Sequence, residues 1–242
     1  MVSFTFTTVI AAAAFFAQSV VAVPSPSVDA NGIYVKRAAS CTFPSPPKTS
    51  SLSAPMTIKG TFDGGNVRYD RGKGACSGQK EGGDKDAVFL LESGATLKVL
   101  ATSTTSGSRM CAKMPSPSKQ TSGTTNIVGG GAKNADDKVI QHNGGGIVNI
   151  DSYCVQDFGK LYRSCGNCKT QYKRTVNISN VIAKNGKLLA GVNSNYGDVA
   201  TIKTSTNSYS SVKSICDTFQ GNDNGKEPTK VTSNQSNSSC KL

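Results

Sequence analysis

The chain of 242 residues is poor in several residue types that particular functions need. His142 is its one histidine, so it lacks the imidazole cluster of a zinc site and any further candidate base for a Ser-His-Asp triad. It also lacks zinc-finger, helix-turn-helix and aromatic ribonucleoprotein patterns, and an amphipathic basic helix suited to lipid. Long helical periodicities are few, and aromatic residues form 7% of the chain. We therefore expect a β-rich protein in which His142 is a satisfied or exposed side chain.

The charge balance points to an anionic partner. Lysine and arginine number 27 against 15 acidic residues, which gives a formal net charge of +12. Nucleic acid, anionic lipid and acidic polysaccharide are the polyanions that fit such a charge. The sequence has no motif that would recognise nucleic acid or lipid, so we expect neither nucleic-acid nor membrane binding. Acidic polysaccharide is the remaining candidate partner.

The N-terminal region has the pattern of an exported protein. An apolar stretch runs from Val9 to Phe16 and small residues follow to Ala22, so residues 1–22 are expected to be a signal peptide, although the usual basic start is missing. Gln18 and Ser19 interrupt a run already too short to cross a bilayer. We expect a secreted, extracellular and monomeric protein.

A basic pair follows at Lys36 and Arg37. It is either a processing site, with residues 23–37 removed as a pro-segment and Ala38 as the mature start, or an ordinary exposed pair. Residues 38–55 are rich in Pro and Ser and are expected to form an extended lead-in, with regular structure from Met56 onward.

Eight cysteines in an exported chain imply disulfides, although their pairing is not readable from the sequence. Cys165 and Cys168 form a CGNC motif, which we expect to be a structural bridge because no βαβ pattern surrounds it. Asn177, Asn234 and Asn237 begin candidate glycosylation sequons.

Short apolar or alternating stretches, separated by Gly, Asn and Asp, recur along the chain and predict β-strands. They lie at 87–91, 96–100, 125–128, 147–150, 175–178 and 200–202. Similar strings, such as Val148-Asn-Ile150 and Val176-Asn-Ile178, return at intervals of somewhat over twenty residues. This repetition predicts an all-β solenoid, a parallel β-helix, rather than an antiparallel sandwich or a leucine-rich repeat.

A group of cations stands out in this repeated region. Lys138 follows Asp136 and Asp137, and Lys160 and Arg163 come about one solenoid turn later. Residues one turn apart stack side by side, so these charges are expected to share one surface patch. Such a cluster is costly unless an anion occupies it, although solvated surface charges are the simpler alternative.

Long strings of the sequence resemble the fungal and bacterial pectate lyases of polysaccharide lyase family three. They are GTFDGGNVRYDRG (60–72), GQKEGGDKDAVFLLESGATLK (78–98) and the region from about Thr125 to GNDNGKEPTKV (221–231). The resemblance implies a single-stranded right-handed parallel β-helix over residues 56–242, secretion, and calcium-dependent β-elimination on polygalacturonate. The family's catalytic-site lysines and arginine fall on Lys138, Lys160 and Arg163.

The resemblance is interrupted between Val99 and Ser118. The family has there a coil with an Asp and a His-Cys pair, and a strand of the type NVWFQDVCEDALTI whose acidic residues bind calcium. This chain reads VLATSTTSGSRMCAKMPSPS, without Asp or Glu. Calcium needs several carboxylate or carbonyl oxygens, so the family's calcium carboxylates are not retained here.

The genetic code suggests a cause for this interruption. Read one nucleotide out of phase, codons for Arg109 to Cys111 permit Asp-Val-Cys, and those for Ala112 to Met114 permit Glu-Asp-Ala. The shifted text extends to GPCNVYNVWFQDVCEDALTI, which is the family strand. We therefore hypothesise a mispredicted splice site or an insertion or deletion, which the transcript sequence tests.

The expected chemistry is an elimination in which Lys138 is the base, and Lys160 and Arg163 hold uronate carboxylates. Arg163 as the base is the alternative, and Asp137 and Arg174 are further expected substrate contacts. A catalytically inactive wall-polysaccharide-binding or effector-like protein is the competing function.

Several other residues have two open interpretations. The aspartates Asp63, Asp84 and Asp86 are expected to form loop turns rather than to bind calcium. The tyrosines Tyr162 and Tyr172 either stack on sugar rings or pack against the protein.

Overall fold

The computed structural model describes residues 39–42, 48–65, 67–71, 84–103, 112–113 and 121–242, with the backbone alone at 99–103 and 112–113. These residues belong to the unit that runs from Arg37 to Leu242. The expected signal peptide and pro-segment lie outside them, as does most of Val99–Ser118. Within the described part, no helix has the length and apolarity needed to cross a bilayer.

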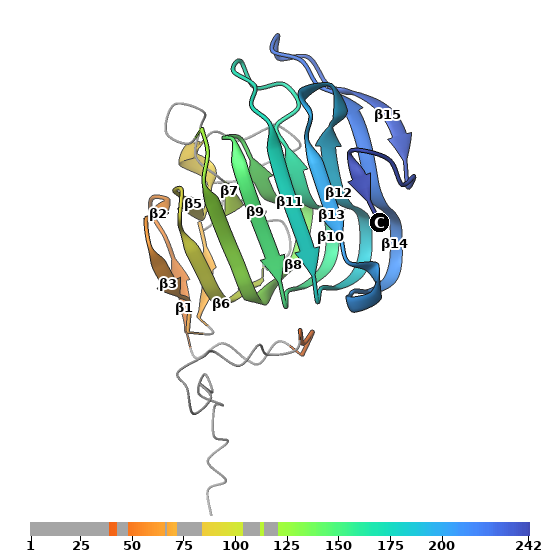
Figure 1. Cartoon of the computed structure of the whole chain (residues 1–242). Helices are drawn as coiled ribbons and strands as arrows, with labels where there is room; N and C mark the ends of the chain where they lie inside the picture. Colours follow the sequence, from red (N-terminus) through yellow and green to blue (C-terminus); the bar gives the residue numbers. More distant parts are fainter. Residues whose placement is uncertain (1–38, 43–47, 66, 72–83, 104–111, 114–120) are drawn as a thin grey trace, which may run out of the picture. The chain divides into compact units, whose positions relative to one another are not determined.

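The described residues form strands that stack almost entirely in parallel (Figure 1). The strands are β1 (Thr49–Ser51), β2 (Met56–Ile58), β3 (Thr61–Asp63), β4 (Arg68–Asp70), β5 (Phe89–Leu91), β6 (Thr96–Ser103), β7 (Ala112–Lys113), β8 (Thr124–His142), β9 (Gly146–Asp151), β10 (Cys154–Ser164), β11 (Arg174–Ser179), β12 (Ile182–Asn193), β13 (Val199–Ile202), β14 (Ser208–Gln220), β15 (Thr229–Ser233) and β16 (Cys240–Lys241). Short 3₁₀ helices are η1 (Asp84–Asp86), η2 (Ser194–Tyr196) and η3 (Thr204–Thr206).

Successive coils align the same positions in two parallel ladders. The long strands β8, β10, β12 and β14 pair in that order along one ladder, and β9, β11 and β13 pair along the other. The chain passes from one ladder to the other and back within each coil. The fold is therefore the single-stranded right-handed parallel β-helix that the sequence predicts.

Stacked aliphatic side chains hold the coils together. Ile127, Ile150, Ile178 and Ile202 occupy one register position and are at most 3% exposed. Full burial of such a side chain contributes roughly 1.5–3 kcal/mol. The alternating burial along β11 explains why a strand and not a helix forms there.

The coils turn at a repeated corner in the long ladder. Asn134, Asp157, Asn185 and Ser211 follow register-matched residues and all have φ between 52° and 60°. Asn and Asp tolerate this left-handed conformation better than most residues, because their short polar side chains bond locally. Asn185 Nδ2 donates to Asp157 Oδ1 at 3.1 Å across two neighbouring corners.

An asparagine ladder supports the other side of the coils. Asn149 Nδ2 donates to Asn126 Oδ1 at 2.9 Å, and Asn177 Nδ2 donates to Asn149 Oδ1 at 2.8 Å. Each amide thereby satisfies its neighbour one coil away. The sequon residue Asn177 is thus part of this ladder, whereas Asn234 and Asn237 are exposed.

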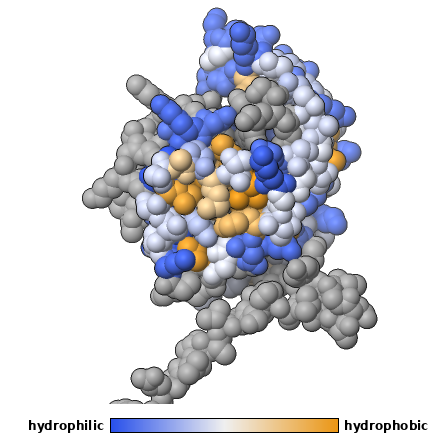
Figure 2. All heavy atoms as spheres, turned by 90° about the vertical axis from the view of Figure 1, so that its left-hand side faces the viewer, coloured by the Kyte–Doolittle hydropathy of each residue, from blue (hydrophilic) through white to orange (hydrophobic). Residues whose placement is uncertain are grey.

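The N-terminal end of the described solenoid is apolar. Seen from the left-hand side of Figure 1, where β1 to β3 lie, apolar residues gather in the middle of the surface and polar residues surround them (Figure 2). Leu52, Met56, Phe62 and Tyr69 are partly buried residues from this end that pack against the core. A solenoid has uncovered apolar side chains at its first coil unless a cap lies on it.

The structure differs from the sequence prediction in two respects. The expected lead-in contains β1, which pairs with β4, and Cys41 of that segment is bridged to Cys154. The sequence pattern also did not predict β10, β12 and β14, because left-handed corners break their alternation into short pieces. The expected Cys165–Cys168 bridge is present, together with a Cys216–Cys240 bridge.

Candidate functional site

A bulge in β8 creates the centre of the site. Ala135 pairs with Phe158 and Lys138 with Lys160, so two residues of β8, Asp136 and Asp137, lie opposite the single residue Gly159 of β10. A Cβ atom on Gly159 would come within 2.3 Å of the Asp136 carbonyl oxygen and 2.5 Å of the Asp137 carbonyl oxygen. Glycine is therefore required for the two strands to approach here.

The bulge brings two of the predicted site lysines to one carboxylate. Lys138 Nζ lies 2.9 Å from Asp137 Oδ2, and Lys160 Nζ lies 3.4 Å from Asp137 Oδ1. The side chains of Lys138, Asp137 and Lys160 are 15%, 21% and 33% exposed, so all three can still meet a ligand from solvent. The expected juxtaposition of Lys138 and Lys160 is confirmed by their direct register pairing.

Asp137 is held as a carboxylate by its two partners. Burial raises the pKa of Asp137, but the charges and hydrogen bonds of Lys138 and Lys160 outweigh it, so the pKa lies below its usual value. Two cations thus share one anion, and the local charge favours a further carboxylate. The contact with Asp137 also orients the Lys138 side chain.

Arg163 lies further along β10 and is nearly buried, with 5% of its surface exposed. Its Nη1 donates to the carbonyl oxygen of Ser164 at 2.9 Å and to Asn193 Oδ1 at 3.0 Å. The guanidinium carbon also lies 4.0 Å from the centre of the Phe219 ring, a cation–π contact. The predicted contact of Arg163 with a uronate stays a prediction, since Ser164, Asn193 and Phe219 hold its guanidinium against the coils.

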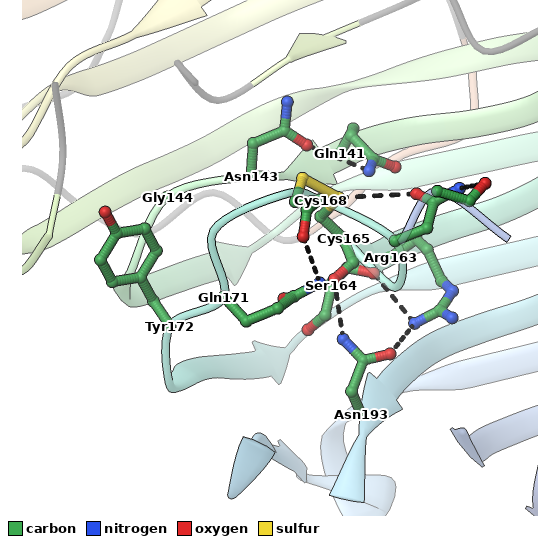
Figure 3. The surroundings of a disulfide bond; sticks show 12 residues. Gln141, Asn143, Gly144, Arg163, Ser164, Cys165, Cys168, Gln171, Tyr172 and Asn193 are labelled. Atoms are coloured by element: carbon green, nitrogen blue, oxygen red, sulfur yellow. Dashed lines mark hydrogen bonds between the residues drawn. A yellow bond between two sulfur atoms is a disulfide. The ribbon is translucent and has the colours of Figure 1, made fainter. Parts of the chain in front are cut away.

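Asn193 connects this arginine to the loop that carries the CGNC motif. Its amide is fully buried, accepts from Arg163, and donates to the Cys165 carbonyl oxygen at 3.0 Å and to Asp198 Oδ2 at 3.2 Å. Figure 3 shows the Asn193 amide and the Arg163 guanidinium pointing toward one another beside the Cys165–Cys168 disulfide. Sequence reasoning missed Asn193, because an isolated asparagine carries no pattern.

Arg174, at the start of β11, is fully buried. Its Nε donates to the Gly144 carbonyl oxygen at 2.8 Å and its Nη2 to that of Asn143 at 2.7 Å, while Nη1 donates to Gln171 Oε1 and to the Tyr172 carbonyl oxygen. The guanidinium thus fastens the preceding loop to the end of β8. The predicted contact of Arg174 with substrate stays a prediction. To bind substrate, the guanidinium would have to give up some of these hydrogen bonds.

Of the two expectations for His142, a satisfied or an exposed side chain, the structure shows the satisfied one. It is fully buried, its Nδ1 lies 2.8 Å from the Tyr162 hydroxyl, and its Nε2 lies 3.4 Å from the Gly145 carbonyl oxygen. Burial, together with the charge of Arg174, lowers the pKa of His142 to about 3. Tyr162 is also fully buried, so of its two interpretations packing is correct.

The remaining candidate residues have local roles. Asp63 Oδ1 accepts from the Gly65 backbone amide at 2.9 Å, which is a turn contact, and Asp84 and Asp86 lie in η1. Tyr172 offers its carbonyl oxygen to Arg174. The loop-turn interpretation therefore fits Asp63.

The described residues do not fit a calcium site built of protein carboxylates. Across 39–42, 48–65, 67–71, 84–98 and 121–242, no three His, Cys, Asp or Glu side chains converge on one point. Calcium takes six to eight oxygen ligands, and Asp137 is already paired with two lysines.

Comparison with known proteins gives the family. The chain matches the pectate lyase family over residues 40–114 and 108–226, which is more than half of its length. The chain belongs to this family. Among curated pectate lyases, the probable pectate lyase E of Neosartorya fischeri is 52% identical over 83% of this chain and 84% of its own length. Pectate lyase E of Emericella nidulans is 50% identical over 86% of each chain.

Solved pectate lyases share the β-helix. The catalytic domain of pectate lyase PelI from Erwinia chrysanthemi aligns with a TM-score of 0.57 at 24% identity, over 82% of this chain and 96% of that domain. PelI in complex with tetragalacturonic acid aligns with a TM-score of 0.52 at 26% identity, over 78% of this chain and 68% of that one. The former supports the fold alone.

The pectate lyase match has an irregularity inside Val99–Ser118. Its two matched stretches overlap at residues 108–114, within that segment. The alignment with the Neosartorya fischeri protein spans 219 positions, whereas 83% of 242 residues is about 201, so about 18 positions of the relative have no counterpart here.

Proposed function

We propose that this pectate lyase is secreted and cleaves α-1,4-linked polygalacturonate by β-elimination at the Lys138–Lys160 pair. One observation carries the proposal: two lysines from neighbouring coils converge on Asp137 at the surface and leave a net positive charge. The bulge fixes this geometry before any ligand arrives, which is what electrostatic stabilisation of a developing charge requires. The PelI complex supports the substrate class, since its ligand is tetragalacturonic acid.

In the proposed reaction Lys138, in its neutral form, removes the proton from the sugar carbon next to the carboxylate. The electron pair of that C–H bond forms the carbon–carbon double bond, and the glycosidic C–O bond breaks with its electrons going to oxygen. The departing oxygen takes a proton from water. Lys160 and Arg163 bind uronate carboxylates and stabilise the negative charge that develops; Arg163 as the base is the alternative.

Asp137 sets the conditions for this base. Its carboxylate lies 2.9 Å from Lys138 Nζ and orients that amine. A uronate bound beside Lys160 competes for the same cations. We therefore expect activity to favour alkaline pH, where neutral lysine is more abundant.

Calcium dependence is the second part of this proposal, and the family supplies its support. Bound calcium would neutralise the uronate carboxylate. The described residues lack a fitting set of ligands, and the segment where the family carries its calcium carboxylates has no acidic residue. Impaired activity of this sequence is therefore part of the proposal.

The test is the release of unsaturated product from polygalacturonate, measured by ultraviolet absorbance. Lys138→Ala and Lys160→Ala should each abolish it. Lys203→Ala, at an exposed lysine directly after β13, should leave it unchanged. Retained turnover in both site variants would refute the proposed mechanism.

A catalytically inactive wall-binding protein is the second candidate function. The observation that favours it is the altered segment Val99–Ser118 together with about 18 missing positions. Binding of polygalacturonate without any unsaturated product, with and without added calcium, would support this candidate over the first.

A further inference from the structure

The fold treats the three glycosylation sequons of this chain differently. Each sequon pairs an asparagine with a serine two residues later: Asn177 with Ser179, Asn234 with Ser236, and Asn237 with Ser239. The glycan is attached to the asparagine amide nitrogen, and the serine hydroxyl is the second group that the sequon supplies. Because a glycan is bulky and polar, the folded chain accommodates one only where these groups face solvent.

Both groups of the Asn177 sequon are engaged in contacts between coils. Asn177 Nδ2 donates to Asn149 Oδ1 at 2.8 Å, and the Ser179 hydroxyl donates to Asp151 Oδ2 at 2.5 Å. Neighbouring strands are about 4.8 Å apart, which leaves no room for a sugar within the asparagine ladder. A glycan on Asn177 would therefore disturb the stacking of the coils.

Asn237 is exposed, but its amide fastens the turn before β16. Its Oδ1 accepts from the backbone amides of Ser239 at 2.8 Å and Cys240 at 2.9 Å. Its Nδ2 donates to the Gln235 carbonyl oxygen at 3.3 Å and to Thr232 Oγ1 at 3.4 Å. Ser239, which supplies the hydroxyl of this sequon, is 5% exposed. The fold thus uses the amide of this sequon and buries its serine.

Asn234 has the arrangement that a glycan requires. Its Oδ1 accepts from the Ile215 backbone amide at 3.0 Å, and its own backbone amide donates to the Cys216 carbonyl oxygen at 2.8 Å. These bonds hold the side chain with its oxygen toward β14. Within the part of the chain that the structure describes, Asn234 Nδ2 has no hydrogen-bond partner, and both Asn234 and Ser236 are exposed. The amide nitrogen that would bind the sugar is therefore accessible from solvent.

Asn234 directly follows the strand at one edge of the sheet. Among the described strands β15 pairs with β14 alone, and it lies beyond β14 at the end of the stack (Figure 1). Thr232 pairs with Thr218 and Lys230 with Phe219, so Val231 lies in a bulge, and it is 55% exposed. An open edge strand presents backbone groups with which a second chain can pair. A bulky polar group next to β15 would prevent this pairing.

We infer that Asn234 carries an N-linked glycan, which shields the β15 edge from pairing with a second copy of this chain. In the transfer, Asn234 Nδ2 forms a bond to the anomeric carbon of a lipid-linked oligosaccharide. The bond from that carbon to the diphosphate of the lipid breaks with its electrons going to the diphosphate, and the amide nitrogen gives up one proton to a base of the transferase. The inference rests on the proposed secretion and is independent of lyase activity.

The first test is to express the full chain in a eukaryotic host that glycosylates secreted proteins. Peptide-N-glycosidase turns a glycosylated asparagine into aspartate, and peptide mass spectrometry should find this conversion at Asn234. Ser236→Ala should abolish it while keeping the asparagine, whereas Ser238→Ala, at an exposed serine that neither overlapping sequon requires, should not. A secreted chain without a glycan at Asn234 would overturn the inference, whether or not Asn177 or Asn237 carries one.

Sedimentation velocity over a concentration series tests the shielding. The glycosylated chain and Ser238→Ala should remain monomeric, whereas Ser236→Ala and the enzymatically deglycosylated chain should form dimers. Val231→Lys added to Ser236→Ala should restore the monomer, because a charge on an edge strand opposes pairing. A Ser236→Ala protein that remains monomeric at the same concentrations would refute the shielding.

Failure of the glycan can be told apart from failure of the proposed function. Recovery of the chain from the medium tests secretion, and product absorbance tests the lyase reaction. A secreted and active chain without a glycan at Asn234 would reject the inference alone. A chain that is not exported would reject both the secretion and the inference that rests on it.

Discussion

Gly159→Ala is the substitution that most directly tests how the bulge builds the site. The added Cβ would lie 2.3 Å and 2.5 Å from two carbonyl oxygens of β8. Carbon–oxygen contacts between strands are about 3.3–3.6 Å, so β8 and β10 must separate by roughly 1 Å at this point. Asp137 and Lys138 are both on β8 and would move together. Lys160 is on β10 and would lose its 3.4 Å contact with Asp137.

The expected cost of this overpacking is about 1–3 kcal/mol of unfolding free energy. A change of 1 kcal/mol shifts the melting temperature of a chain of this size by about 2–4 °C, so the melting temperature should fall by about 2–12 °C. Thermal unfolding followed by circular dichroism measures it. Affinity for polygalacturonate, measured well below the melting temperature, should also fall because the two lysines no longer share one carboxylate.

Gly60→Ala is the matched control, since a Cβ there meets nothing within 4 Å. It should leave both the melting temperature and the affinity close to those of the unmodified chain. If Gly159→Ala had the same melting temperature and the same affinity for polygalacturonate as Gly60→Ala, the close approach of β8 and β10 at the bulge would not be what positions Lys160.

Three further predictions concern pH and the altered segment. The pKa of His142 falls from 6.5 to about 3 on folding, so the unfolded chain binds the proton at a higher pH than the folded chain does. The free energy of unfolding should therefore drop as pH falls from about 6.5 toward 3, by at most about 1.4 kcal/mol per pH unit. Urea unfolding should show this slope, and His142→Asn should lack it. Burial raises the pKa of Asp217, but its contacts with Lys230, Ser214 and Ser233 lower that pKa overall. The Asp217 carboxylate should therefore stabilise the fold above about pH 3.8, and this stabilisation should be lost at lower pH. In Asp217→Asn the melting temperature should depend less on pH in that acid range. Replacing Val99–Ser118 by the alternate reading frame should raise calcium-dependent product release, and no gain would count against the frame hypothesis.

The sequence determined the class of the fold because its repeats are local and regular. Strings such as Val148-Asn-Ile150 and Val176-Asn-Ile178 return at matching positions, and each buries its aliphatic residues in the same column. The same regularity made the stacking of Lys138 on Lys160 predictable, since one turn separates them. The family resemblance, carried by long strings, is confirmed by the comparisons.

Local irregularity limited what the sequence could reveal. The bulge at Asp136 and Asp137 places two residues of β8 opposite the single residue Gly159 of β10, and no sequence pattern indicated this extra residue. The burial of Arg163 depends on residues far along the chain, Asn193 and Phe219, and that of Arg174 on Asn143 and Gly144 of the preceding coil.

By itself, then, the sequence specified an all-β solenoid and a cationic patch, because periodic aliphatic and charged positions need only the coil repeat to meet. The tertiary structure alone decided that Lys138 and Lys160 remain accessible beside Asp137 and that Arg163 and Arg174 are buried. The outcome depends on the loops and later coils that pack over each strand. The tertiary structure likewise placed Lys187 opposite Lys213 on neighbouring coils, because their alignment depends on the register between β12 and β14.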